Sequence, residues 1–219
     1  MKKYALIVAG GSGTRMGADV PKQFLLLNGR PLLMHTLEKF NGCEIILVLP
    51  HDQFSYWQEL CITYSFQLPH RLCEGGKTRF QSVQNGLDCI PRADALVAIH
   101  DGVRPLVHAS TILQSFTTAA EKGNAVAAVE LKDSIRQITN AGNTKHVNRD
   151  EYRLVQTPQT FKVSQIKLAY AQVPHQEFTD DAGVLEATGT QINLIAGSYD
   201  NLKITTPEDL KIAACLLAV

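Results

Sequence analysis

The sequence alternates short, wholly apolar runs with segments whose apolar residues recur at helical spacing. Apolar runs of roughly four to eight residues, bounded by glycine or proline, are typical of strands buried on both faces of a sheet. Strand–helix alternation of this kind predicts an α/β fold with a mostly parallel sheet that is covered by helices on both faces. The expected strands are residues 4–9, 44–49, 95–100, 125–131 and 192–196, and the expected helices are residues 31–40, 52–64, 78–89, 110–122 and 207–217.

The pattern changes near residue 132. Residues 134–138 alternate polar and apolar side chains, residues 140–143 have the composition of a turn, and residues 145–147 follow. This pattern predicts a β-hairpin outside the main sheet, an arm at about residues 132–153. A lone hairpin is marginally stable in water, so the arm needs a surface to pack on, and a second copy of the chain is one candidate. We expect one domain over residues 1–219 that carries this arm.

Composition excludes several classes of function. The 219 residues include 21 basic and 21 acidic ones, so no global field draws the chain to nucleic acid or to a membrane. The five cysteines form no C-x-x-C pair, which is typical of buried thiols in a reducing compartment, and the seven histidines form no zinc signature. No apolar stretch approaches the roughly 18 residues of a membrane span, and the short apolar run at the amino terminus does not look like a signal peptide. We expect a cytoplasmic protein with no nucleic-acid or membrane partner.

A glycine-rich loop follows the first expected strand directly. It contains Gly10, Gly11, Ser12 and Gly13, and Arg15 comes two residues later. Glycines let backbone N–H groups approach a polyphosphate, and a guanidinium adds a fixed fork of donors. The spacing fits neither the dinucleotide fingerprint nor the P-loop. The alternative is a tight turn beside a surface arginine.

Two further stretches extend this candidate phosphate site. Lys22 follows a proline and places a second cation close to the glycine loop, although most lysines are simply exposed. Downstream, Gly75 and Gly76 are suited to bring backbone against a flat base, and Ser82 offers a hydroxyl one turn inside the next helix. The alternative for this second stretch is a strand-to-helix connector with Thr78 near the helix cap.

Charged residues also end the third strand and precede the last helix. Asp101 stands at a carboxyl strand end, where a carboxylate can hold Mg²⁺ through water or orient a hydroxyl. Arg104 can hold a phosphate bidentately, or the two residues can brace a turn as an Asp–Arg pair. Lys203 is expected in a short strand before the helix start at residues 206–209, and that helix start does not explain the lysine.

Three polar groups are weaker signals when they are considered alone. Ser134, Arg149 and residues 156–159 lie on or near the expected arm, where exposed polar residues are ordinary. Residues 179–181 (Thr-Asp-Asp) precede an expected helix, so capping is the plain interpretation. None of these groups would indicate a site without the rest of the chain.

Taken in order, these segments resemble the 2-C-methyl-D-erythritol 4-phosphate cytidylyltransferases and their relatives, the ribitol-5-phosphate cytidylyltransferases. Any one motif is weak, but eight in the same order are specific, and they run from residue 9 to residue 210. The matching pieces are A-G-G-S-G-T-R-M-G, P-K-Q-F, G-G-K-T-R-F-Q-S-V, H-D-G-V-R-P, V-N-R-D, Q-T-P-Q-T-F, T-D-D-A and D-N-L-K-I-T-T-P-E-D-L.

The resemblance implies a Rossmann-like nucleotidyltransferase fold and a homodimer whose β-arms cross into the partner's active site. It implies transfer of CMP from CTP to 2-C-methyl-D-erythritol 4-phosphate with release of pyrophosphate, a step of isoprenoid precursor synthesis. A divalent cation, Mg²⁺ or another, would act through the triphosphate; no strong protein ligand is predicted, and Asp101 is the one candidate.

The same resemblance assigns roles to individual residues. The catalytic cations would be Arg15, Lys22 and Lys203. Polyol-phosphate contacts would come from Asp101, Arg104 and Lys203, together with Ser134 and Arg149 of the other subunit. The CTP site would be lined by Ala9, Gly10, Gly11, Ser12, Gly13, Gly76, Ser82 and Asp101.

Two departures and three rival functions accompany this interpretation. Lys77 stands where some family members carry Asp, which bears on cytosine recognition, and Ser134 stands where some carry Thr and keeps the hydroxyl. The same chemistry on ribitol 5-phosphate is the nearest alternative. A non-catalytic nucleotide sensor would lack Lys22 or Lys203, and both are present. A nicotinamide dehydrogenase is disfavoured because the dinucleotide fingerprint fails.

Overall fold

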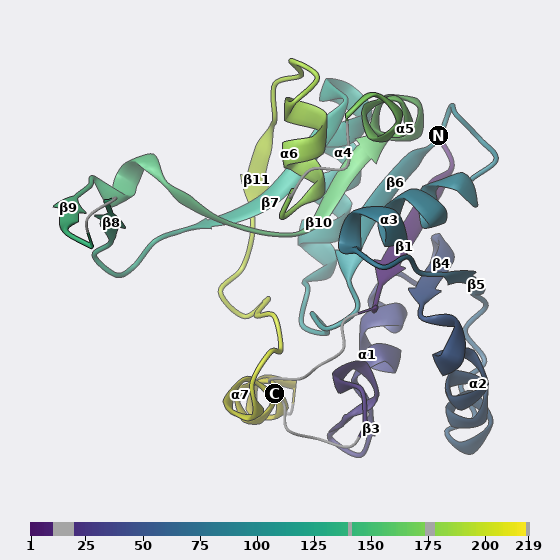
Figure 1. Cartoon of the computed structure of the whole chain (residues 1–219). Helices are drawn as coiled ribbons and strands as arrows, with labels where there is room; N and C mark the ends of the chain where they lie inside the picture. The colour runs from purple at the N-terminus through teal and green to yellow at the C-terminus, as the bar shows by residue number, and fades with distance from the viewer. Residues whose placement is uncertain (11–19, 140–141, 174–177, 218–219) are drawn as a thin grey trace.

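The computed structural model describes residues 1–10, 20–139, 142–173 and 178–217. The strands of its main sheet are β1 (Lys3–Val8), β4 (Glu44–Leu49), β5 (Arg71–Glu74), β6 (Leu96–Asp101), β7 (Asn124–Glu130), β10 (Arg153–Lys162) and β11 (Leu194–Ala196). They lie in the order β11-β7-β10-β6-β1-β4-β5 (Figure 1). All neighbouring pairs are parallel except those of β10, which runs antiparallel to both β6 and β7. The expected mostly parallel sheet is confirmed.

Helices cover both faces of the sheet because successive strand residues point to opposite sides. On one face, α1 (Leu32–Lys39), α2 (Phe54–Thr63) and α4 (Ala109–Lys122) contribute to the apolar cluster that contains Ala5 and Ile7 of β1. On the other face, α3 (Arg79–Asp88), α5 (Val163–Gln172) and α6 (Asp181–Glu186) pack on Leu6 and its neighbours. Gly86 permits the close approach of α3, since a Cβ there would lie 2.3 Å from Leu6 Cδ1.

A smaller apolar cluster joins the two ends of the chain. Leu27 of β2 (Leu26–Leu27), which pairs with β3 (Arg30–Pro31), packs with Ile204 and with Ala213 of α7 (Pro207–Leu217). The 3-10 helix η2 (Lys22–Phe24) lies immediately before β2, and Lys203 is next to Ile204. This cluster therefore brings Lys22 and Lys203 into one region, although the two residues are far apart in sequence.

The hairpin expected after residue 132 is present. Strands β8 (Arg136–Ile138) and β9 (Thr144–His146) pair antiparallel and form the end of an arm that reaches away from the body (Figure 1). A 3-10 helix, η4 (Arg149–Glu151), lies on the returning side of the arm before β10. Both strands fall inside the expected range 132–153, whereas residues 140 and 141 of the expected turn lie outside the described residues.

Three local details differ from the expectations. Residues 156–159 directly follow the arm, but they lie within β10 in the main sheet, and Gln156, Thr157 and Gln159 are buried instead of exposed. Lys203 lies in an irregular segment and not in a strand. The helix expected at residues 52–64 is present as α2 but begins at Phe54, because His51–Gln53 form a 3-10 turn, η3.

None of the described helices combines the length and the apolar character that crossing a bilayer requires.

Candidate active site

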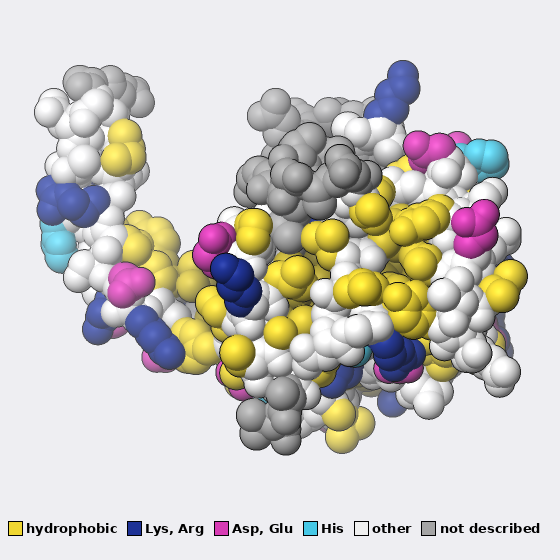
Figure 2. Space-filling model, turned by 90° about the horizontal axis from the view of Figure 1, so that it is seen from below, with side chains coloured by type: hydrophobic (Ala, Val, Ile, Leu, Met, Phe, Trp, Pro, Cys, Tyr) yellow, Lys and Arg dark blue, Asp and Glu magenta, His cyan; other side chains and the backbone are white. Residues whose placement is uncertain are grey.

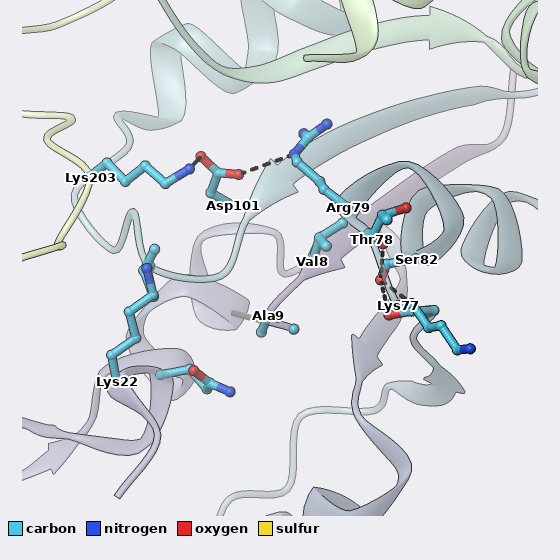
Figure 3. A pocket seen from close by; sticks show the side chains of 13 residues that line it. Val8, Ala9, Lys22, Lys77, Thr78, Arg79, Ser82, Asp101 and Lys203 are labelled. Atoms are coloured by element: carbon cyan, nitrogen blue, oxygen red, sulfur yellow. Dashed lines mark hydrogen bonds and ion pairs between the residues drawn. The ribbon is translucent and has the colours of Figure 1, made fainter. Parts of the chain in front are cut away.

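A cavity opens where β1 and β6 end, beside the start of α3 (Figure 3). Ligands of open parallel sheets commonly bind at this carboxyl edge. The cavity wall combines exposed backbone with positively charged side chains, and Lys22 and Lys203 enter it from opposite ends of the chain. The described residues that line it are Val8, Ala9, Gly10, Lys22, Gln23, Gly76, Lys77, Thr78, Arg79, Ser82, Asp101, Val103 and Lys203.

The loop before α3 is held rigidly by its own side chains. Ser82 Oγ accepts a hydrogen bond from Gly76 N at 3.0 Å and donates one to Thr78 O at 2.9 Å. Thr78 caps α3, since its Oγ1 accepts from Gln81 N at 3.1 Å. A Cβ on Gly76 would lie 2.3 Å from Gln81 Cβ, so the site requires glycine there. Thr78 thus caps the helix as the alternative interpretation proposed, and the same hydrogen bonds hold the Gly76 backbone beside the cavity.

Asp101 lies at the centre of a group of cations. Lys203 Nζ is 3.1 Å from Asp101 Oδ2, Arg104 Nε donates to the same oxygen at 3.2 Å, and Arg79 Nε is 4.0 Å from Oδ1. The dashed lines of Figure 3 trace the Lys203–Asp101–Arg79 part of this group. Burial by itself would raise the pKa of Asp101, but the charges of Lys203, Arg79 and Arg104 outweigh burial and hold this pKa well below its usual range. The carboxylate is therefore a fixed anion whose orientation is set from three sides.

A second cavity adjoins the first and shares Arg79, Asp101 and Lys203 with it. Its wall comes from β10, from the residues that precede α6 and from the loop after β6. The remaining described residues that line it are Arg104, Arg153, Leu154, Val155, Gln156, Thr157, Gln159, Thr179 and Asp180. The three shared residues thus stand at the junction of two adjacent spaces, an arrangement suited to two reactants that must meet.

The structure brings most of the expected site residues together. The first cavity is lined by Ala9, Gly10, Lys22, Gly76, Ser82, Asp101 and Lys203, and Arg104 lines the second. The expected contributions of Gly11, Ser12, Gly13 and Arg15 fall on residues outside the described ranges. Lys77 lies at the rim, and in Figure 3 its side chain points away from Asp101 and Lys203.

Ser134 and Arg149 are not brought to this site within one chain. Both are exposed on the arm, and the described lining of either cavity includes neither. Arg149 Nη1 instead donates to the backbone oxygen of Lys132, which ties the two sides of the arm together.

Sequence reasoning missed two pairs of residues that shape the site. Arg79 forms a two-pronged ion pair with Asp181, 102 residues away, at 2.8 and 2.7 Å. Asn201 Nδ2 donates to Thr157 O at 2.8 Å, and Thr157 Oγ1 accepts from Asp101 N at 3.1 Å. All four residues stand inside motifs that the sequence offered, but no local spacing indicates which of them would meet.

A protein-built metal centre does not fit this site. The described residues contain no cluster of three or more His, Cys, Asp or Glu side chains placed to hold a metal ion. Both oxygens of Asp101 face cations. A metal ion on this carboxylate would add positive charge where positive charge already gathers.

The fold and the paired cavities define a nucleotide-binding α/β enzyme of the nucleotidyltransferase type. The family model for 2-C-methyl-D-erythritol 4-phosphate cytidylyltransferase matches residues 4–218. The chain belongs to this family.

Individual relatives agree with the family match. The enzyme of this name from Porphyromonas gingivalis is 51% identical over 99% of this chain and 98% of its own length, and the one from Bacteroides thetaiotaomicron is 47% identical over 99% and 100%. Among solved structures, the 2-C-methyl-D-erythritol 4-phosphate cytidylyltransferase of Thermus thermophilus is 32% identical, covers all of both chains and superposes with a TM-score of 0.84.

Proposed function

We propose that this chain transfers the CMP group of CTP to 2-C-methyl-D-erythritol 4-phosphate. The products are 4-diphosphocytidyl-2-C-methyl-D-erythritol and pyrophosphate, and the reaction serves non-mevalonate isoprenoid synthesis in the cytoplasm. The observation that carries the proposal is the junction of two cavities at Arg79, Asp101 and Lys203. A nucleotide in the first cavity and a polyol phosphate in the second would meet at this junction.

In this reaction, an oxygen of the acceptor phosphate attacks the α-phosphorus of CTP in line. The bond from the α-phosphorus to the bridging oxygen breaks, and pyrophosphate leaves with the electron pair. The nucleophile is already ionised at neutral pH, so no general base is required. The main obstacle is repulsion between two anions, about 4 kcal/mol for two unit charges about 4 Å apart at a moderate effective dielectric. Lys22 and Lys203 would offset this repulsion and stabilise the charge that builds on the transition state.

The remaining roles follow from the two walls. Backbone at Ala9, Gly10 and Gly76 would contact CTP. Ser82 would contribute to base recognition indirectly, because its hydroxyl accepts from the Gly76 N–H and holds that backbone in place. On the other side, Asp101 would accept a hydrogen bond from an acceptor hydroxyl and Arg104 would contribute positive charge to the acceptor's phosphate. Arg15, together with Gly11, Ser12 and Gly13, is assigned to the triphosphate by family resemblance.

Family members use a divalent cation, and we infer that Mg²⁺ enters bound to the triphosphate. This inference follows from the lack of a ligand cluster in the described residues and from the cations that surround Asp101. It keeps the expectation from the sequence that the cation is held through the triphosphate, and it drops Asp101 as a candidate protein ligand. The cation would neutralise phosphate charge.

We further infer a homodimer formed through the arm. Tyr152, Leu154 and Val155 are 43%, 52% and 44% exposed where the arm joins the body. Hydrophobic side chains gather at that junction in Figure 2. Every residue of the arm strands β8 and β9 is exposed, and a two-stranded hairpin needs a surface to pack on. In a dimer, Ser134 and Arg149 of one arm would reach the acceptor cavity of the other subunit. Light scattering of the full chain and of Leu154→Asp tests this, and a monomeric native chain would contradict it.

A matrix assay of pyrophosphate release tests the function itself. The purified chain would be supplied with CTP, UTP, ATP or GTP, each with 2-C-methyl-D-erythritol 4-phosphate or ribitol 5-phosphate, with Mg²⁺ and with EDTA. We expect release with CTP and methylerythritol phosphate, and loss of release with EDTA. Preference for ribitol 5-phosphate would identify that compound as the acceptor. If the chain bound nucleotide but released no pyrophosphate with any combination, it would be a nucleotide sensor and not an enzyme.

A further inference from the structure

A line of alternating charges runs from the cavity junction into the protein core. Lys203 contacts Asp101, Asp101 faces Arg79, and Arg79 pairs with Asp181. At the inner end, the Tyr170 hydroxyl donates to Asp181 Oδ1 at 2.6 Å. The outer members line the cavities, whereas Asp181 has no exposed surface and lines neither of them in the described structure.

Asp181 is a buried charge with a fixed set of partners. Each of its carboxylate oxygens accepts one hydrogen bond from the Arg79 guanidinium, and its backbone N–H donates to Gln159 Oε1 at 3.1 Å. Burial of an ion is costly unless it is paired and hydrogen-bonded, so this carboxylate strongly constrains where the guanidinium lies. Burial and the charge of Asp181 also raise the pKa of Tyr170 far above its usual value, so its hydroxyl remains a donor.

Arg79 transfers this constraint to the site. Its side chain is 27% exposed and lines both cavities, while its Nε lies 4.0 Å from Asp101 Oδ1. Two of its nitrogens are committed to Asp181, and the third faces Asp101. Burial opposes the charge on Arg79, but Asp181 outweighs burial and raises the pKa of Arg79, so the bridge stays charged. Asp181, which lies outside the pocket, therefore fixes one of the three cations that face the Asp101 carboxylate.

We propose that Asp181 is a positioning residue for the transfer reaction, and that it acts through Arg79 to orient Asp101 toward the polyol phosphate. This inference rests on the proposed function, because it assigns Asp101 to the acceptor. The competing view is that Asp181 merely stabilises the first turn of α6, where an acidic residue is favourable in any case.

The effect is selective for the acceptor because the nucleotide loop has separate supports. Gly76 is held by Ser82, and Thr78 caps α3 through Gln81, with no contact to Asp181 among these bonds. Loosening the Arg79–Asp181 pair therefore disturbs the junction and the second cavity, and leaves the glycine backbone of the first in place.

The test compares steady-state kinetics of the full chain and its variants, with KM measured separately for CTP and for methylerythritol phosphate. Arg79→Lys cannot form the two-pronged pair, but it keeps a positive charge beside the buried Asp181 and so disturbs the fold least. We expect the acceptor KM to rise about tenfold, with the CTP KM within about twofold of the native value. Arg92→Lys is the matched control, since Arg92 pairs with Asp94 on the surface at 3.0 and 2.8 Å, and its kinetics should equal those of the native chain.

A double-mutant cycle separates positioning from simple stabilisation. If Asp181 acts through Arg79, then Asp181→Asn raises the acceptor KM in the native chain and has no further effect on it in an Arg79→Met background. The inference would be overturned if Asp181→Asn raised the acceptor KM by the same factor in both backgrounds, or if Arg79→Lys left the acceptor KM unchanged. In either case the native chain would still catalyse CTP-dependent transfer. Failure of the native chain to release pyrophosphate would instead reject the proposed function on which the inference stands.

Discussion

Replacing Lys203 by alanine should slow the chemical step far more than it weakens CTP binding or folding. Lys203 Nζ lies 3.1 Å from Asp101 at the cavity junction, with 41% of its side chain exposed. A unit charge about 4 Å from a reacting phosphate is worth about 4 kcal/mol at an effective dielectric of about 20. Removal of a single group that stabilises transition-state charge typically costs about 3 kcal/mol in enzymes. Since about 1.4 kcal/mol corresponds to tenfold in rate, we expect kcat to fall about 100-fold.

The cost in stability should be small. Arg104 and Arg79 remain beside Asp101 after the change, and a half-exposed ion pair contributes only about 0–1 kcal/mol. The melting temperature should therefore fall by less than about 4 °C. Stopped-flow pyrophosphate release gives kcat, titration calorimetry gives the CTP affinity, and Lys211→Ala on α7 is the matched control. A kcat within about threefold of the native value, or a loss seen equally in Lys211→Ala, would refute the reasoning.

Three further predictions concern the nucleotide loop and the buried histidine of β6. Ser82→Ala removes both hydrogen bonds of the hydroxyl, so unfolding should cost about 1 kcal/mol less by urea titration and the CTP KM should rise. Gly76→Ala forces the loop away from Gln81, so calorimetry should show CTP affinity about tenfold lower. Burial lowers the pKa of His100 to about 4, so between pH 6.5 and 4 the unfolded chain binds a proton that the folded chain does not, and stability should fall as the pH falls through this window. His100→Gln should flatten that part of the urea-stability profile, and an unchanged slope would contradict the assignment.

The parts of the fold that depend on local sequence patterns can be predicted from the sequence. Apolar runs such as residues 44–49 predict the buried parallel strands, and Gly123, with φ of +96°, ends α4 as expected. The arm is visible because its polar alternation and turn composition differ from the sheet. Several of the residues that line the first cavity stand out in the sequence, because glycines and charged residues lie near the ends of the expected strands.

The parts that were missed depend on partners far away in the chain. Strand β10 has a polar centre and contains Pro158, so its composition favours a loop. It lies in the core because Gln156 donates to Ser198 O and Gln159 accepts from the backbone of α6, while the pairing register shifts around the proline. Asp181 was understood as a helix start because its pairing with Arg79 spans 102 residues.

The placement of β10 between β6 and β7 affects how the molecule is assembled during synthesis. A nascent chain that has emerged as far as β7 already holds the strands that β10 will join, yet their facing edges have no neighbour until residues 153–162 leave the ribosome. Unpaired strand edges invite association with other chains. Thr157, which accepts from the Asp101 backbone, arrives with that same strand, so filling the gap between β6 and β7 and placing the β10 side of the acceptor wall are one event.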